Sequence, residues 1–172
     1  EYLLYDLVIG NPPYGEHRGL YKGLGEEPKI SKYEDYFVKR SLDSLRDGGI
    51  LAMVLPSAWL ERQKKLQKAE ILDAFRLPSG VFKGTQVGTD IIILKKNSQK
   101  LNQNISDYFQ KNQMHILGET RQKTNRFGKL EDYVFGSLEG ASAMLQQLQN
   151  NKNKIGIGNL FHQPTETTAE KN

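Results

Sequence analysis

The sequence contains no cysteine and no long hydrophobic run. The lack of cysteine excludes disulfide bonds and thiolate metal sites. No stretch of 18 consecutive apolar residues occurs, so we expect no membrane-spanning helix. The three histidines, His17, His115 and His162, lie in unrelated segments, and we therefore expect no metal site. This composition predicts a soluble, cytoplasmic protein.

The chain is long enough for one modest domain with an appendage, and it is mildly basic. Its 172 residues include 24 Lys and Arg against 20 Asp and Glu, which gives a net charge of +4. Basic residues gather at 62–68, where a solvated helix face is an equal interpretation. They gather again at 121–129, where interleaved Thr and Asn favour a loop. Within that loop, phosphate contacts are expected from Arg121, Lys123 and Arg126.

The most informative feature is the tetrapeptide Asn-Pro-Pro-Tyr at residues 11–14. It follows an apolar run at residues 7–9, which predicts a short buried strand. The two prolines end that strand, because proline has no N–H for the sheet ladder. An amide and an aromatic ring are thereby held at the carboxyl end of a buried strand. In open α/β sheets, ligands bind at that edge.

These residue types suit the binding of an amino group on a flat ring. The side-chain oxygen of Asn11 and the carbonyl of Pro12 can accept hydrogen bonds from one planar –NH2 group. Tyr14 can stack on the ring that carries the group. Such an amine is a poor nucleophile, because its lone pair is delocalised into the ring. Two fixed acceptors would draw the nitrogen toward a tetrahedral geometry and stabilise the positive charge that grows during attack.

The next segments predict alternating helices and strands. Ser31 and Glu34 have the spacing of a capping box, and the helix that follows is expected to stop at Gly48-Gly49. Residues 50–55 predict a second buried strand, parallel to the first because a helix connects the two. Ser57 is placed to cap another helix.

Residues 71–77 and 89–94 predict two further strands, the second by its β-branched content. The short glycine-containing connection between them favours antiparallel pairing. The fold class is therefore α/β.

Four ordered segments resemble the catalytic domain of a family of DNA methyltransferases. Residues 6–14 are similar to the catalytic motif of N6-adenine DNA methyltransferases of the Asn-Pro-Pro-Tyr type, Eco57I-like or Type I-like. The segments at residues 47–49, 57–60 and 77–89 also resemble that family. The resemblance covers about residues 5–96. It implies a partial Rossmann-like fold with strands 4 to 7 of the family sheet.

The resemblance implies a role for each residue of the motif. Asn11 and the carbonyl of Pro12 would accept from the adenine N6 amine, in a catalytic motif completed by Pro13 and Tyr14. Tyr14 would stack on the flipped base, and Phe82 would touch its other side. Base extrusion costs a few kcal/mol and one aromatic stack returns about 1–3 kcal/mol, so two rings offset most of the cost.

The glycine-rich segment that holds S-adenosylmethionine in this family has no counterpart here. In the resembling enzymes it precedes the catalytic strand, and only Asn11 remains as a cofactor contact. We therefore expect the C-terminal half of a catalytic domain, inactive alone, whose partner is the missing N-terminal half. The first strand would then have an open apolar edge. Such an edge predicts poor solubility, a homodimer, or cover from the C-terminal segment.

The organisation changes after residue 96. Residues 97–104 predict a polar linker. Residues 105–161 contain short apolar islands and an amphipathic helix near 139–149, so we expect a mainly helical or irregular appendage packed on the main domain. Residues 162–172 predict a disordered tail. The stretch 105–149 resembles a region that follows the methylase motifs in large methylase–helicase proteins of bacterial mobile elements.

Two other functions remain open at this stage. Similar tetrapeptides occur in protein-glutamine and ribosomal-RNA methyltransferases. A non-catalytic DNA- or protein-binding module is an alternative of another class, because the cofactor half is missing. The Phe82 segment and the appended region favour DNA methylation, as in restriction-modification, and Lys83 would then join the contacts to the DNA backbone.

Overall fold

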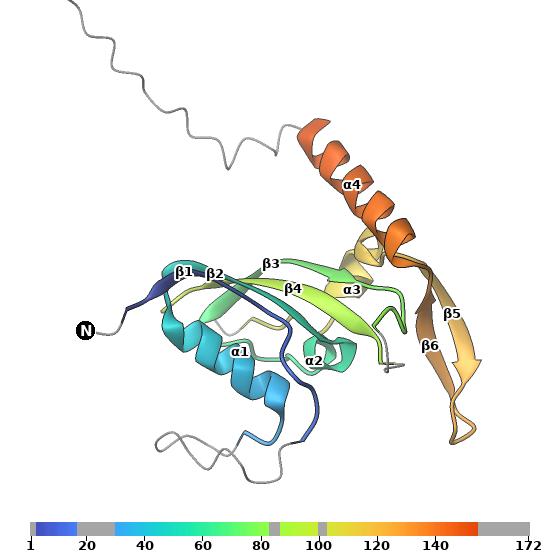
Figure 1. Ribbon diagram of the computed structural model, residues 1–172, viewed down its shortest axis with the longest axis horizontal. Coiled ribbons are helices and arrows are strands. Elements are labelled where there is room, and N and C mark those ends of the chain that lie inside the picture. The colour runs from blue at the N-terminus through green and yellow to red at the C-terminus, as the bar shows by residue number, and fades with distance from the viewer. Residues whose placement is uncertain (1–2, 17–29, 83–86, 100–102, 155–172) are drawn as a thin grey trace, which may run out of the picture.

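The computed structural model describes residues 3–16, 30–82, 87–99 and 103–154 (Figure 1). The predicted tail at 162–172 and the predicted contact Lys83 lie outside these ranges. The elements up to residue 96 are β1 (Tyr5–Gly10), α1 (Tyr33–Ser44), β2 (Leu45–Pro56), α2 (Ser57–Glu61), β3 (Ala69–Arg76) and β4 (Thr89–Lys96). The later ones are α3 (Tyr108–Lys111), the 3-10 helix η1 (Gln113–His115), β5 (Glu119–Thr124), β6 (Leu130–Phe135) and α4 (Leu138–Lys154). Within the described ranges, no helix combines the length and apolar character needed to cross a membrane.

The first four strands form one sheet in the order β1-β2-β4-β3. β1 and β2 pair in parallel through α1, and β4 pairs antiparallel with both β2 and β3. The predicted parallel pair and the predicted antiparallel pair are both confirmed. The place of β4 between β2 and β3 was not predicted. It makes β1, β2 and β3 run in one direction, so their carboxyl ends lie at one edge of the sheet.

The residues of β4 explain its central position. Ile92 and Leu94 point into the core cluster that contains Val38 and Leu42 of α1. Ile91 packs against a second cluster, on which α4 lies. Because both faces of the strand are covered, its sequence is a continuous β-branched run rather than an alternation of apolar and polar residues.

The predicted capping box does not form. Lys32 is the N-cap of α1 and makes no side-chain capping bond. Glu34 is buried and its Oε2 instead accepts the backbone N–H of Gly15, at 3.0 Å. The spacing of Ser31 and Glu34 is typical of a local helix cap, whereas Glu34 makes its contact across 19 residues of sequence.

The other two predicted boundaries also differ from the structure. α1 ends at Ser44, and Gly48-Gly49 lie inside β2 rather than at a helix stop. A side chain at Gly49 would meet the carbonyl oxygen of Asp6 at 3.2 Å, so this glycine permits the close approach of β1. The hydroxyl of Ser57 does not cap α2, because it donates to Asp90 at 2.8 Å.

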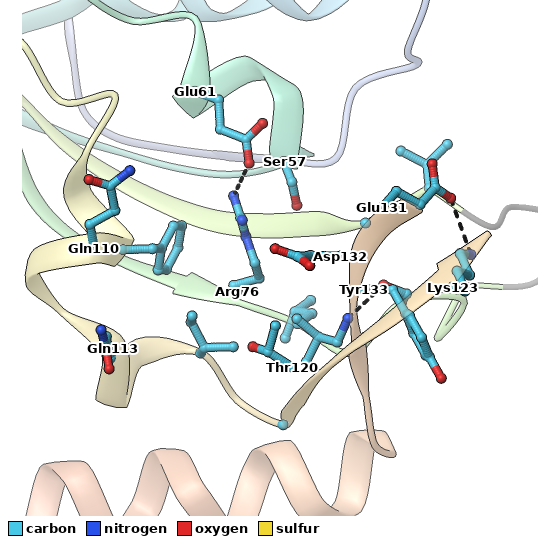
Figure 2. A pocket seen from close by; sticks show the side chains of 18 of the residues that line it. Ser57, Glu61, Arg76, Gln110, Gln113, Thr120, Lys123, Glu131, Asp132 and Tyr133 are labelled. Atoms are coloured by element: carbon cyan, nitrogen blue, oxygen red, sulfur yellow. Dashed lines mark hydrogen bonds and ion pairs between the residues drawn. The ribbon is translucent and has the colours of Figure 1, made fainter. Parts of the chain in front are cut away.

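The appendage contains a β-hairpin that the sequence analysis did not predict. β5 and β6 pair antiparallel from Glu119 with Phe135 to Thr124 with Leu130. The interpretation of residues 121–129 as a loop is therefore wrong for β5. This short polar strand is stabilised by its backbone pairing with β6. Thr120 and Asp132 of the hairpin point toward Arg76 at the end of β3 (Figure 2).

The C-terminal region packs on the sheet, as expected of its apolar islands. Ile105 and Phe109 belong to the cluster beneath the sheet. Leu117 and Ala141 form the second cluster with Phe75 and Leu77. The predicted amphipathic helix is confirmed as α4, which is longer than expected and packs through Met144, Leu145 and Leu148.

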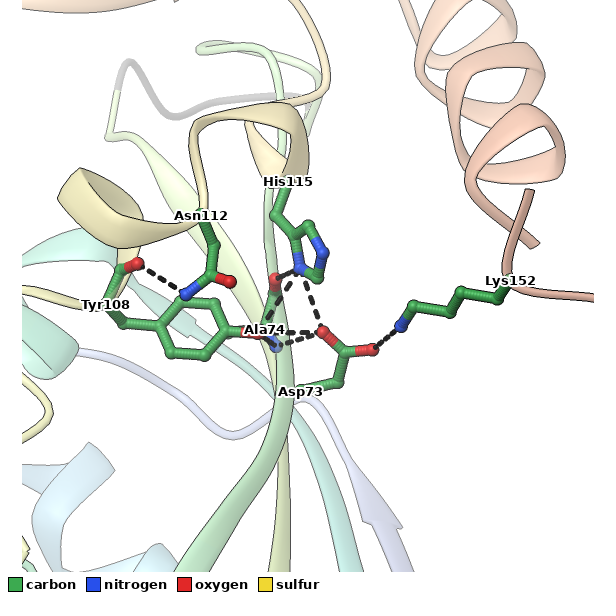
Figure 3. Close-up of polar contacts among 6 residues, drawn as sticks. All are labelled: Asp73, Ala74, Tyr108, Asn112, His115 and Lys152. Atoms are coloured by element: carbon green, nitrogen blue, oxygen red, sulfur yellow. Dashed lines mark hydrogen bonds and ion pairs between the residues drawn. The ribbon is translucent and has the colours of Figure 1, made fainter. Parts of the chain in front are cut away.

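A half-buried carboxylate, that of Asp73, ties this region to β3 (Figure 3). Asp73 Oδ1 accepts from the Tyr108 hydroxyl at 2.8 Å and lies 2.9 Å from Nδ1 of His115, while its Oδ2 lies 2.8 Å from the Lys152 ammonium. Burial, and then the Asp73 carboxylate, raise the pKa of the Tyr108 phenol, so it stays protonated and donates. Asp73 thereby holds α3, η1 and α4 to one point of the sheet.

β1 is an edge strand, as predicted, and its apolar side chains are exposed. Leu7 and Ile9 are 52% and 74% exposed. Exposed apolar edges invite pairing with another chain. The predicted self-association therefore stays a prediction, and the structure supplies the residues with which to test it.

Replacing Leu7 and Ile9 together by Lys is expected to lower self-association while the fold is kept, because charged side chains discourage edge pairing. Sedimentation velocity across a concentration series measures the effect. Leu72→Lys is the control, since Leu72 is also half-exposed but lies on β3 at the far end of the sheet order. An equal effect of both changes would contradict pairing through β1.

Asp73→Ala is expected to lower the free energy of unfolding by about 2 kcal/mol, because several hydrogen bonds are lost together. Urea unfolding measures the change. Asp43→Ala provides a control, because its exposed pair with Lys39 on α1 contributes less than about 1 kcal/mol. If the two variants unfold alike, Asp73 does not hold the C-terminal region in place.

Candidate active site

The Asn-Pro-Pro-Tyr segment leaves the carboxyl end of β1 and is anchored to β2. The Tyr14 hydroxyl lies 3.0 Å from the carbonyl oxygen of Val54 and 3.1 Å from Oδ1 of Asn11, and it can donate to either. Pro12 is buried and Asn11 is exposed. The amide is thus held at the carboxyl edge of the sheet, which is the location that the sequence predicted.

A second anchor comes from the first turn of α1. The N–H of Gly15 donates to Glu34, and the N–H of Tyr33 donates to the carbonyl of Gly15 at 2.9 Å. Gly15 has φ +107°, a conformation that favours glycine. Arg62 lies 3.6 Å from the other oxygen of Glu34. Sequence reasoning missed Glu34 as a positioning residue, because its spacing from Ser31 indicated a cap.

The electrostatics keep the Tyr14 phenol neutral. Burial raises its pKa, and the Glu34 carboxylate adds to that effect. A neutral phenol donates a hydrogen bond and does not act as a base. The hydroxyl is therefore available as a donor to the Val54 carbonyl or to Oδ1 of Asn11.

The site can accept hydrogen bonds from an amino group. A carbonyl oxygen has two lone pairs, so Asn11 Oδ1 retains capacity for a second donor beside Tyr14. The described residues do not by themselves fit S-adenosylmethionine. Along β1 the sheet edge is open and apolar, and within the described ranges no glycine-rich turn follows a parallel strand.

The other predicted site residues lie elsewhere. Phe82 is half-buried and packs against the second cluster, next to Val81. Arg121 and Lys123 lie on one face of β5, because they are two residues apart on a strand, and Arg126 lies in the turn of the hairpin. The structure does not bring these residues to the Asn11 loop through any hydrogen bond or ion pair among the described residues.

A cavity of about 990 Å³ lies between the sheet, α3 and the hairpin (Figure 2). Neither residues 11–14 nor Phe82 line it. Arg76 at its base donates to Asp90 at 2.9 and 3.0 Å and lies 3.0 Å from Glu61. Burial raises the pKa of the Asp90 carboxyl, and the Arg76 guanidinium opposes that shift.

The lining of this cavity does not suit an anion. Arg76 is fully engaged with carboxylates, and Lys123 is 3.7 Å from Glu131. Asp132 adds another carboxylate. We therefore assign Arg76 a structural role, in which it neutralises the buried Asp90.

Part of the chain is similar to a known protein family. Residues 3–87 match the Eco57I restriction-modification methylase family. We call residues 3–87 the methylase segment, after the family that they resemble. The described residues form a mixed α/β fold, which is the fold class that the sequence predicted. The methylase segment contains the Asn11 loop, β1, β2 and β3, and it ends before β4.

Two curated proteins are similar to the chain. Defense against restriction protein B of Escherichia phage P1 is 30% identical over 113 residues, which are 59% of this chain and 5% of that protein. Type II methyltransferase M.TthHB8I of Thermus thermophilus is 31% identical over 122 residues, which are 56% of this chain and 27% of that protein. The chain thus spans only a small part of either relative.

Two solved structures also match part of the chain. The M protein of the Type I restriction enzyme EcoKI is 23% identical with a TM-score of 0.44, over 60% of this chain and 23% of that one. A class I S-adenosylmethionine-dependent methyltransferase from Listeria monocytogenes is 23% identical with a TM-score of 0.42, over 58% and 34%.

Tyr14→Phe is expected to destabilise the methylase segment by about 1 kcal/mol, because it leaves the Val54 carbonyl without this donor. Thermal and urea unfolding measure the loss. The exposed Tyr5 supplies the control, Tyr5→Phe, for which a change within about 0.5 kcal/mol is expected.

The pH dependence provides an independent check. The folded-state pKa of Tyr14 is raised, so its contribution to stability is complete below the unfolded-state pKa of about 10. That contribution is lost as the pH rises through the folded-state value. Identical alkaline unfolding of the wild type and Tyr14→Phe would contradict the assignment.

Proposed function

We propose that this chain supplies the amine-binding half of an S-adenosylmethionine-dependent DNA methyltransferase that acts on the N6 amine of adenine. The observation that carries the proposal is the exposed Asn11 at the carboxyl end of β1, whose Oδ1 lies 3.1 Å from the Tyr14 hydroxyl. Its position within a restriction-modification methylase segment supports DNA as the substrate. The names of the two relatives, a methyltransferase and a protein that acts in defense against restriction, are consistent with this reading.

The proposed chemistry needs only hydrogen-bond acceptors from this chain. Asn11 Oδ1 and the Pro12 carbonyl would accept the two N–H groups of the adenine amine, which makes its nitrogen a better nucleophile. Glu34 is a poor candidate for a base, because it is buried and already binds Gly15 and Arg62. The methylated amine would therefore lose its extra proton to water.

The base itself would be held in a flipped position. We propose that the ring of Tyr14 stacks on one face of the adenine and that Phe82 contacts its other side. In the structure Phe82 is half-buried and packs against the second cluster. Lys83, Arg121, Lys123 and Arg126 would contact phosphates.

The methyl donor would be held by a separate half of the domain. The open edge of β1, with Leu7 and Ile9 exposed, supports a parallel strand as its neighbour. S-adenosylmethionine bound to that half would supply the methyl group. The relatives are several times longer than this chain, which fits an enzyme assembled from more segments than this one.

Asn11→Ala is expected to lower the rate of methyl transfer by about 100-fold or more, because one preorganised polar contact to the reacting group is lost. Transfer of labelled methyl groups to DNA, by the enzyme that combines this chain with its cofactor-binding half, measures the rate. DNA binding should change little, since Asn11 bears no charge. Asn150→Ala on α4 is the matched control, because Asn150 is exposed and far from the motif in sequence.

Mass spectrometry of the digested product tests the substrate. N6-methyladenine is the expected product. Methylated cytosine, or preferential transfer to RNA or to protein glutamine, would contradict the proposal. DNA binding without any transfer by the assembled enzyme would favour the non-catalytic alternative.

A further inference from the structure

The tip of the β5–β6 hairpin exposes a large apolar ring. Phe127 is 72% exposed, and Leu130 beside it is 69% exposed. The hairpin lies at the end of the molecule away from the N-terminus, and its tip extends away from α4 (Figure 1). The root is held by Val134, whose backbone N–H and carbonyl both bond to Ser79. The hydrogen bonds that hold the tip join residues of the described hairpin to one another.

The turn that carries Phe127 is firmly built. Asn125 Oδ1 accepts the backbone N–H of Phe127 at 2.9 Å and that of Lys129 at 3.1 Å. The N–H of Asn125 donates to the carbonyl of Lys129 at 2.8 Å, and that of Gly128 donates to the carbonyl of Asn125 at 2.9 Å. Gly128 has φ +75°, which suits glycine. The ring is therefore presented on a stiff support rather than on a loose loop.

The charges of the hairpin are unevenly distributed. On the strands, Arg121 pairs with Glu119 at 2.7 Å and Lys123 lies 3.7 Å from Glu131. The turn at 125–129 contains Arg126 and Lys129 but no acidic residue. The Arg126 guanidinium lies 4.8 Å from the centroid of the Phe127 ring. Positive charge that no carboxylate of the turn offsets is thus concentrated around the exposed ring.

We propose that Phe127 is a wedge that inserts into the base stack of DNA while Arg126 and Lys129 contact the flanking phosphates. Apolar side chains that insert between base steps are a known means of unstacking a duplex. An extruded base leaves a gap that one flat ring can fill. The inference rests on the proposed function, because it takes duplex DNA as the substrate.

The surroundings of the ring favour DNA over a protein partner. The exposed apolar surface of the tip is narrow, one ring with Leu130, and it is flanked by cations. A base stack has the same layout, an apolar interior between two rows of phosphates. A stiff two-stranded ribbon also fits the groove of B-DNA, which is about 12 Å wide on the major side.

The test compares two 24-base-pair duplexes of one sequence, one intact and one with a central abasic site. The abasic duplex already contains the gap, so the 172-residue chain is expected to bind it about 5-fold more tightly or better, as expected for one aromatic stack. Fluorescence anisotropy with labelled duplexes measures both affinities. Phe127→Ala should remove the preference, and Phe127→Trp should retain it.

Two controls separate the ring from other effects. Met114→Ala removes another strongly exposed apolar side chain, on η1, and should leave the preference unchanged. Replacing Arg126 and Lys129 by Ala should weaken the binding of both duplexes equally and reduce its salt dependence. Thermal unfolding checks that Phe127→Ala is folded, which is expected of an exposed position.

The outcomes distinguish this inference from the proposed function. A preference that survives in Phe127→Ala, or is absent from the wild type, overturns the wedge while DNA binding still supports the methyltransferase. If Phe127→Ala changes only the association of the chain with itself, the tip is a protein contact and the wedge is wrong. Failure to bind either duplex contradicts the proposed DNA substrate itself.

Discussion

The hydrogen bond between the Tyr14 hydroxyl and the Val54 carbonyl is the contact on which the candidate site depends. It joins the segment after β1 to the neighbouring strand at the carboxyl edge of the sheet. The same hydroxyl lies 3.1 Å from Oδ1 of Asn11, and because it carries one proton it donates to one of the two oxygens at a time. Burial and the nearby Glu34 keep the phenol protonated, which this arrangement requires.

The parallel pairing of β1 and β2 makes that contact possible. Because β4 runs antiparallel between β2 and β3, the sheet keeps three carboxyl ends together while its centre is covered on both faces. The C-terminal region completes this cover. Asp73 and the second cluster attach it to β3. The hairpin then extends beyond the end of the sheet at which β1 and β2 end (Figure 1).

The sequence predicted the elements whose signals are local. Three of these signals lie within neighbouring residues. They are the β-branched run of β4, the prolines that end β1 and the amphipathic pattern of α4. The helix caps predicted from Ser31, Glu34 and Ser57 are wrong. A polar side chain that can cap a helix can equally well bond to a distant partner, as Glu34 and Ser57 do. The hairpin was missed because β5 has no apolar residue and β6 has its apolar residues at Leu130 and in one run, Tyr133 to Phe135, so neither strand shows the alternation that marks a half-buried strand. Asn11 and Tyr14 were found from the motif, whereas the positioning role of Glu34 depends on a contact that no spacing indicates.

We propose that this chain holds the amine-binding half of a methyltransferase and that S-adenosylmethionine binds to another half of the domain. Titration calorimetry of S-adenosylmethionine into the purified chain tests this proposal. We expect no detectable heat up to millimolar cofactor, because the described residues offer acceptors for an amino group and no glycine-rich turn after a parallel strand. Binding in the micromolar range would contradict it and would show that the cofactor site is built from residues of this chain.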